Sequence, residues 1–157
     1  MTLTDPADQE TTVADPARTP EERKHDALKR LDTEVDAWVS TASTDGTPYL
    51  VPLSFLWDGG SLWLSTAANN PTSRNLKASG QLHLAIGQTR DVLLITGTAT
   101  PAVPSDELAD AFATKCGFDP RQSNYPYFQV QPQRIQAWRE VNELPNRILM
   151  NNATWLI

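Results

Sequence analysis

Short apolar runs separated by tight-turn signals constrain this chain more than any other feature of its sequence. The first of three runs is rich in β-branched and small residues, and Asp45-Gly46 and Asp58-Gly59-Gly60 lie between the runs. Such a pattern predicts strands joined by hairpins, so we expect an antiparallel meander here. These three runs span residues 37–43, 49–57 and 61–66.

Helix signals appear at three further places. Thr19 is the expected N-cap of a helix that ends near Asp32, with Pro20 first in the helix and Glu22 completing a capping box. Ser105 is the expected N-cap of the third helix, which Gly117 ends. The predicted helices cover residues 20–32, 72–79 and 106–116; Asn70 is the expected N-cap of the second, Pro71 its start and Gly80 its end.

The remaining segments complete a predicted barrel. Strands are expected at residues 81–87 and 91–102, followed after the third helix by a loop over residues 119–126. A long strand, bent at Pro132, is expected over residues 127–139, with a final strand pair around Asn151-Asn152. This order predicts a mainly β fold, a small antiparallel β-barrel with peripheral helices.

Pro52 stands inside the second apolar run. Proline cannot donate a backbone hydrogen bond to a neighbouring strand. The second strand is therefore expected to have a free edge or a bulge at this position.

Charge divides the 157 residues into two parts. Residues 1–36 carry ten acidic and five basic side chains, whereas the other 121 residues carry nine and eight. All twelve Trp, Tyr and Phe residues follow residue 36. We expect residues 1–18 to be a disordered tail and residues 19–157 to form a single domain.

Composition also excludes several classes of protein. A formal net charge of -6 argues against a general nucleic-acid-binding protein. No segment is apolar enough to span a membrane, and the N-terminus lacks the features of a secretory signal. A cytoplasmic protein is the expectation, and a single cysteine, Cys116, excludes an intrachain disulfide framework.

Motifs for side-chain catalysis are absent. The chain has no dinucleotide-binding, phosphate-loop or nucleophile-elbow motif. His25 lies in a charged helix and His83 alternates with leucines in a strand, so neither is expected to be catalytic or to bind a metal. We predict no catalytic side chain, and any chemistry would therefore come from a bound cofactor.

One segment has the composition of an anion site. A strand ends at Ser65-Thr66, and a short helix then begins with hydroxyl and basic side chains. The free N–H groups of a helix N-terminus, together with hydroxyls and a guanidinium, suit a phosphate. A capped surface helix explains the same residues, and this segment taken alone favours that interpretation. The segment's candidate ligands are Ser65, Thr66, Thr72, Ser73, Arg74 and Lys77.

The order of these segments resembles the flavin-binding split-barrel superfamily, which includes pyridoxamine 5'-phosphate oxidase and deazaflavin-dependent relatives. The resemblance runs from about Val35 to Trp138 and extends weakly to Arg147. It includes the strands VSTASTDGTPYLVPLSFLWDGGSLWLST, the helix TSRNLKAS and the segment RIQAWREVNELPNR. It implies a split β-barrel of the FMN-binding type that is a homodimer.

The resemblance also implies roles for individual residues. Ser73 and Arg74 match the pair that binds the flavin phosphate, with Thr66 and Lys77 nearby. A second strand that lines the ring system matches Tyr49, Pro52, Leu53 and Ser54. The residues that would complete the pocket from the partner subunit are Trp138, Arg139 and Arg147.

Some family positions carry different residues here. The oxidase has basic residues where this chain has Tyr49, Ser54 and Asn75, and its substrate-binding arginine corresponds to Glu143. Oxidation of pyridoxamine 5'-phosphate is therefore not expected. Many deazaflavin reductases have a lysine where this chain has Thr72.

The resulting hypothesis is a flavin-type oxidoreductase. It would hold FMN or coenzyme F420 at a dimer interface and exchange hydride with a small organic substrate. One alternative is a non-catalytic module that binds flavin, deazaflavin or haem. Another is a β-barrel interaction domain that binds no ligand.

Overall fold

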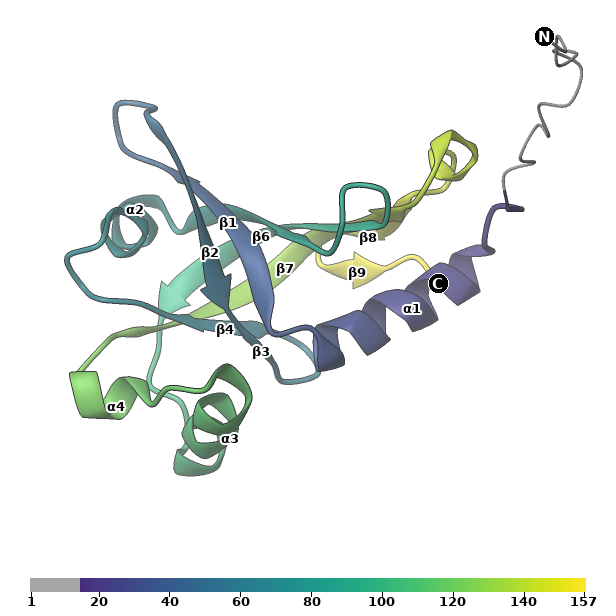
Figure 1. The fold of residues 1–157 in the computed structure, drawn as a ribbon. Helices are drawn as coiled ribbons and strands as arrows, with labels where there is room; N and C mark the ends of the chain where they lie inside the picture. The colour runs from purple at the N-terminus through teal and green to yellow at the C-terminus, as the bar shows by residue number, and fades with distance from the viewer. Residues whose placement is uncertain (1–14) are drawn as a thin grey trace, which may run out of the picture.

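The computed structural model describes residues 15–157, so the predicted tail lies almost wholly outside the described residues. A curved antiparallel sheet forms the body, with helix α1 along one side and the shorter helices at the opposite end (Figure 1). The elements in chain order are α1 Pro20–Thr33, β1 Asp36–Ala42, β2 Pro48–Ser54, β3 Leu56–Trp57, β4 Leu62–Ser65, α2 Pro71–Ser79, β5 Gln81–Ile86, β6 Val92–Pro101, α3 Asp106–Cys116, α4 Pro120–Ser123, β7 Tyr127–Trp138, η2 Val141–Glu143, β8 Ile148–Asn151 and β9 Thr154–Trp155.

The sheet has the topology of a split barrel. Its strand order is β2-β1-β5-β6-β7-β4-β3, and β8 and β9 extend from β7. The two ends of this path approach each other, because β2 contacts β4, yet no hydrogen-bonded ladder joins them. The mainly β prediction is confirmed, and the gap between β2 and β4 is the split.

The predicted meander is only partly correct. β1 and β2 form the expected hairpin, but the second run breaks at Phe55 and its end pairs with β4 as a separate strand, β3. Phe55 is fully buried and its N–H donates to the Val35 carbonyl at 2.9 Å. Burying this ring turns the chain out of β2, so β4 joins β7 instead of β2.

The free edge expected at Pro52 is confirmed, because β2 ends the sheet path. Two backbone hydrogen bonds, Ser43 N–H to Thr47 O and Phe55 N–H to Val35 O, show which opposed residue pairs of the β1–β2 ladder are hydrogen-bonded to each other. Hydrogen-bonded and non-hydrogen-bonded pairs alternate along an antiparallel ladder. The backbone groups of the non-hydrogen-bonded residues of β2 therefore point away from β1, and these residues are Pro48, Leu50, Pro52 and Ser54. Both prolines therefore stand where the missing N–H costs no ladder bond.

The helix caps follow the sequence closely. Thr19 accepts a hydrogen bond from Glu22 N–H and Ser105 accepts one from Leu108 N–H, while Gly80 and Gly117 end their helices at positive φ. The predicted loop over residues 119–126 instead contains α4. Asp119 caps this short helix and Pro120 begins it, an N-terminal signal that the sequence already carried.

The main hydrophobic core lies inside the sheet. Ala27 and Leu31 of α1 are buried against it, together with Phe55, Phe128 and the inward residues of the central strands. A second, smaller cluster of Trp63, Ala109, Phe112 and Tyr127 joins α3 to β4 and β7. The bend expected at Pro132 is a bulge between β6 and β7, where the register shifts after Thr96. In the described part of the chain, no helix has the length and apolar character that crossing a membrane requires.

Candidate functional site

The N-terminus of α2 carries no side-chain cap. Asn70 occupies the N-cap position, but its amide donates to the Thr66 hydroxyl at 2.7 Å and makes no capping bond. Pro71 lacks an N–H, and the Arg74 N–H is already bonded to the Asn70 carbonyl at 3.1 Å. The N–H groups of Thr72 and Ser73 therefore have no intrahelical or capping partner at the positive end of the helix dipole.

The hydroxyl groups around this helix start divide into two kinds. Ser65 donates to the Pro126 carbonyl at 2.8 Å, and Ser73 donates to the Ala67 carbonyl at 2.8 Å. These side chains, with Thr66, hold the loop between β4 and α2. Thr72 differs, because it is 1% exposed and its hydroxyl has no hydrogen-bond partner in the described structure.

Arg74 projects from α2 into an open groove of about 470 Å³ between this helix and the β1–β2 hairpin. We call it the hairpin groove. Tyr49 lines the same groove. The structure therefore brings together Arg74, which was expected to bind the flavin phosphate, and Tyr49, which was expected to line the ring system. Arg74 makes no side-chain hydrogen bond or ion pair to residues 15–157, so its guanidinium is available to an anion. The other residues of this groove include Thr47, Pro48, Pro71 and Asn75.

Lys77 lies on another side of α2 from Arg74. It lines a separate groove of about 730 Å³ formed with α4 and the ends of β6 and β7. We call this the α4 groove. Side chains three residues apart on a helix differ by only about 60° and can share one face, but here Arg74 and Lys77 line different grooves.

The β2 edge beside the hairpin groove offers backbone groups. Pro52 and Ser54 direct their carbonyls to the open edge, and Ser54 adds an N–H. Leu53 has the opposite orientation, since its backbone faces β1 and its side chain packs against the core. The Ser54 hydroxyl donates to Asp36 at 2.7 Å.

Trp138, Arg139 and Arg147 lie at the other end of the sheet. Trp138 pairs with Val92 at the start of β6, whereas α2 contacts β6 near its end, where the Ala99 N–H bonds to Gly80 O. At roughly 3.3 Å per residue, this separation is on the order of 25 Å. The Arg147 guanidinium lies 6.0 Å from the centre of the Trp138 ring. One chain alone therefore does not place these residues beside Arg74.

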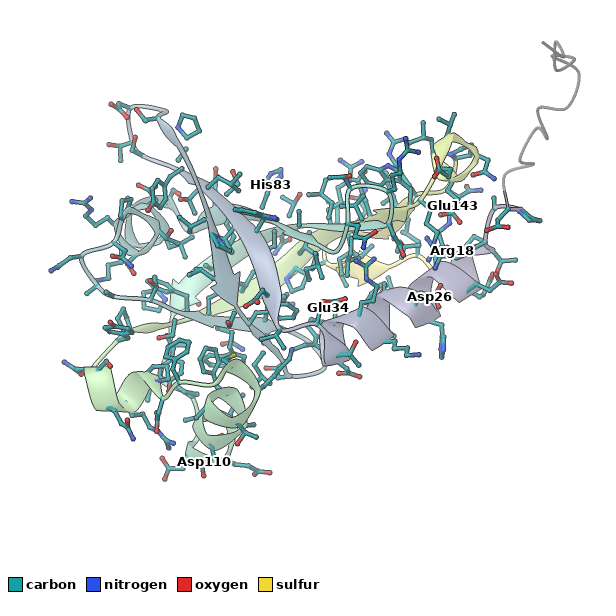
Figure 2. The ribbon with its side chains drawn as sticks, viewed as in Figure 1. Arg18, Asp26, Glu34, His83, Asp110 and Glu143 are labelled. Carbon is teal, nitrogen blue, oxygen red and sulfur yellow. The ribbon has the colours of Figure 1, made fainter. Side chains whose placement is uncertain are left out.

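Charged side chains gather where the start of α1 meets η2, and we call them the Glu143 cluster. The Arg18 guanidinium donates to both oxygens of Glu143, at 2.9 and 2.8 Å, and to Asp26 at 2.9 Å (Figure 2). Arg18 was expected in a disordered tail, but its side chain is only 9% exposed. The remaining members of the cluster are Arg23, Asp91 and Arg139.

Glu143, which stands where the oxidase has its substrate-binding arginine, lies in the interior of this cluster. It is 2% exposed and accepts hydrogen bonds from the backbone N–H groups of Arg18 and Arg139 as well as from the Arg18 side chain. The Arg18 hydrogen bond lowers the pKa of Glu143 to about 2 against the opposing effect of burial. Glu143 therefore belongs to a buried ionic network with Arg18 and Arg23, whereas the exposed Arg139 side chain pairs with Asp26 and Asp91 at its edge.

Neither histidine is part of a catalytic arrangement in the described structure. His83 projects from the face of the sheet and lines an open polar groove of about 600 Å³ with Ser40, Thr41 and Thr96 (Figure 2). Burial raises the pKa of Cys116 to about 11, so its thiol stays protonated and is a poor nucleophile.

Two features of this region were missed by sequence reasoning. Asn75 donates to the Thr41 hydroxyl at 3.0 Å in a buried hydrogen bond that ties α2 to β1. Trp38 and Leu50 form an exposed apolar face on β1 and β2, with exposures of 52% and 59%. Alternation along the first apolar run gave a signal for Trp38, but nothing local identified Asn75.

Sequence comparison assigns this fold to a family. A family model described as pyridoxamine 5'-phosphate oxidase matches residues 25–139, well over half of the chain. The chain belongs to the pyridoxamine 5'-phosphate oxidase family. No curated protein matches it at a significant level.

Solved structures of this family's fold resemble the chain at low sequence identity. An F420 reductase has a TM-score of 0.58 at 19% identity, covering 68% of this chain and 93% of its own. The haem storage protein HutZ from Vibrio cholerae has a TM-score of 0.53 at 16% identity, covering 72% of this chain and 89% of its own. An FAD-binding protein from Mesorhizobium loti has a TM-score of 0.55 at 13% identity, covering 71% and 89%. These likenesses establish the pyridoxamine 5'-phosphate oxidase fold and nothing finer.

Proposed function

We propose that this protein is a flavin-type oxidoreductase that binds FMN, or alternatively coenzyme F420, with its phosphate in the hairpin groove. The observation that carries the proposal is the uncapped start of α2 beside the unpaired Arg74. Family membership and the neighbours described as F420 reductase and FAD-binding protein support a flavin-type ligand. A phosphate would receive the free N–H groups of α2 and the Arg74 guanidinium.

The residues present suit such a phosphate. Arg74 supplies a cation without a carboxylate beside it and lines the groove, whereas Thr72 carries an unpartnered hydroxyl in the first turn of α2 that is buried and does not line the groove. Tyr49 adds a hydroxyl from β2 on the opposite wall. Ser65, Thr66 and Ser73 have a supporting role in this proposal, because their hydroxyls hold the loop that precedes α2.

The edge of β2 would orient the ring system. Ser54 would donate its outward N–H and Pro52 would offer its carbonyl, two complementary groups for the polar edge of a flavin. The cofactor ring supplies the hydride chemistry when bound. The chain's residues would position that ring and exclude water, which agrees with the lack of a catalytic side-chain arrangement among the described residues.

We also propose that the protein acts as a homodimer through the exposed sheet face that carries Trp38 and Leu50. Monomeric proteins seldom expose large apolar side chains side by side, and an open β2 edge invites pairing. A second copy would bring Trp138, Arg139 and Arg147 toward the hairpin groove, which one chain cannot do. Sedimentation showing a monomer at micromolar concentration would contradict this part of the proposal.

The direct test is a spectrum of the purified protein followed by titration with each cofactor. Bound flavin absorbs near about 450 nm and bound deazaflavin near about 420 nm, since the chemistry resides in the ring. Arg74→Gln should weaken binding of either cofactor by about tenfold or more, because a charge-assisted hydrogen bond contributes roughly 1.5–3 kcal/mol. Binding of neither cofactor by the wild-type protein would contradict the proposal.

A non-catalytic binding module is the second candidate. The likeness to a haem storage protein and the lack of side-chain catalysts among residues 15–157 support it. Reoxidation of the bound, reduced cofactor by a quinone, an enone or dioxygen distinguishes the two. A rate above that of the free cofactor supports an oxidoreductase, and an equal or lower rate supports storage or transport.

A further inference from the structure

The α4 groove has a shape and chemistry of its own. Its walls come from four separate parts of the chain, namely the loop after β4, α2, the end of β6 and the α4–β7 segment. At about 730 Å³ it is larger than the hairpin groove and has the volume of a small-molecule site. The hairpin groove has no lining residue in common with it.

The two cations of the α4 groove are not equivalent. Arg121 bonds to Asp119 at 2.9 Å and to Asp110 at 2.7 Å, so two carboxylates compensate its charge. Lys77 makes no ion pair or hydrogen bond with any residue of the described chain. An anion in this groove would therefore find its positive partner in Lys77.

Apolar and aromatic side chains line the groove together with Lys77. Pro101, Pro126 and the ring of Tyr125 line it, and Tyr125 is 37% exposed. An aromatic ring packs favourably against tyrosine and proline rings, so this lining suits a ligand with an aromatic ring. A second aromatic residue, Tyr127, also lines the groove, and its ring packs edge-on against Phe112 of α3.

The hydroxyl of Tyr127 is a buried hydrogen-bond donor without an acceptor in the described structure. The residue is 8% exposed, and its hydroxyl has no partner among the described residues. Burial raises the pKa of Tyr127, so this hydroxyl is a neutral donor at physiological pH. Leaving such a donor unpaired costs about 1–3 kcal/mol, a cost that a ligand oxygen would remove. Since the hydroxyl is covered, a ligand that reaches it displaces part of the groove wall.

From these observations we infer that the α4 groove binds a small hydroxylated aromatic acid. The carboxylate of the ligand pairs with Lys77, its ring lies against Tyr125 and the prolines, and its ring oxygen accepts from the Tyr127 hydroxyl. The inference is independent of the proposed function, because none of the groups assigned here contacts the hairpin groove.

The test uses 4-hydroxybenzoate, benzoate and the uncharged 4-hydroxybenzyl alcohol as probes of the full-length protein, with binding followed by calorimetry. Saturable binding of 4-hydroxybenzoate is expected, and Lys77→Gln should weaken it by about tenfold, the effect of one charge pair. Lys29→Gln removes an exposed lysine of α1 and should leave the affinity unchanged. Lys77→Gln should not alter binding of the uncharged alcohol.

Tyr127→Phe tests the contact with the buried hydroxyl. It should weaken 4-hydroxybenzoate several-fold and leave benzoate unaffected, because only the first ligand carries an oxygen for this hydroxyl. Absence of saturable binding at millimolar concentration, or equal affinities for wild type and Lys77→Gln, would overturn the inference. Titration of the same samples with FMN reports the proposed function separately, so the failure of one is distinguishable from failure of the other.

Discussion

Basic side chains occur at both ends of this molecule, but their surroundings differ. At the Glu143 cluster, Arg18 is 9% exposed and bonds to Glu143 at 2.8 Å and to Asp26 at 2.9 Å. At the α2 end, Arg74 and Lys77 are exposed and make no ion pair with the described residues. A compensated charge holds the fold together, whereas an uncompensated one beside a groove is available to a ligand. Net charge alone therefore says little about binding.

Burial decides how much each region contributes to stability. Charges taken out of water must be paired, and breaking such a pair leaves an uncompensated group in the interior. The exposed pair of Arg90 and Glu140, at 3.2 Å, offers a contrast within the same chain, because solvent screens it. We therefore expect mutations at the Glu143 cluster to change stability and mutations at the hairpin groove to change ligand affinity.

The largest expected effect is that of Glu143→Gln. The amide keeps the shape but leaves Arg18 and Arg23 without their shared carboxylate, so the free energy of unfolding should fall by about 3 kcal/mol. Urea denaturation measures this change. Glu140→Gln is the matched control and should cost under about 0.5 kcal/mol. If Glu143→Gln and Glu140→Gln lowered the free energy of unfolding by similar amounts, burial would not explain the difference between the two ion pairs.

Acid should weaken the same cluster. The pKa of Glu143 lies at about 2 in the folded protein, below its ordinary value of 4.5, so its contribution is complete above pH about 4.5 and is lost as the pH falls toward 2. Unfolding experiments between pH 6 and pH 2 should show a decline that is shallower in Glu143→Gln. Parallel pH profiles for the two proteins would contradict the assignment.

Arg74→Gln should change ligand affinity and leave stability nearly unchanged. We expect cofactor affinity to fall by about tenfold or more while the free energy of unfolding changes by under about 0.5 kcal/mol, because the side chain is exposed. Fluorescence titration with FMN and denaturation of the unliganded protein measure the two quantities. A large loss of stability without a loss of cofactor affinity would mean that Arg74 stabilises the fold and does not bind the cofactor.

Thr72→Val tests the smallest effect. Replacing an unpaired buried hydroxyl with a methyl group should stabilise the unliganded protein by up to about 1 kcal/mol. The same change should weaken cofactor binding a few-fold, because the phosphate loses one donor. Thermal unfolding with and without FMN measures both. A destabilised variant would mean that the hydroxyl already has a partner.

Local signals identified much of the fold. The caps at Thr19 and Ser105, the stops at Gly80 and Gly117 and the free edge at Pro52 all follow from one residue and its immediate neighbours. Where a distant contact decided the outcome, the prediction was incomplete. Phe55 is buried against the core, and that burial ends β2 and sends β4 to β7.

The same division applies to the site. The sequence by itself determined the barrel class, the helix that begins at Pro71 and the presence of Arg74 after a strand that ends in hydroxyls. Only the tertiary structure decided which charges are compensated, because an ion pair such as Arg18–Glu143 joins residues 125 positions apart. It also separated Lys77 from Arg74 and left Thr72 and Tyr127 without partners. Propensity acts between neighbours along the chain, whereas burial and charge pairing depend on which segments meet in space.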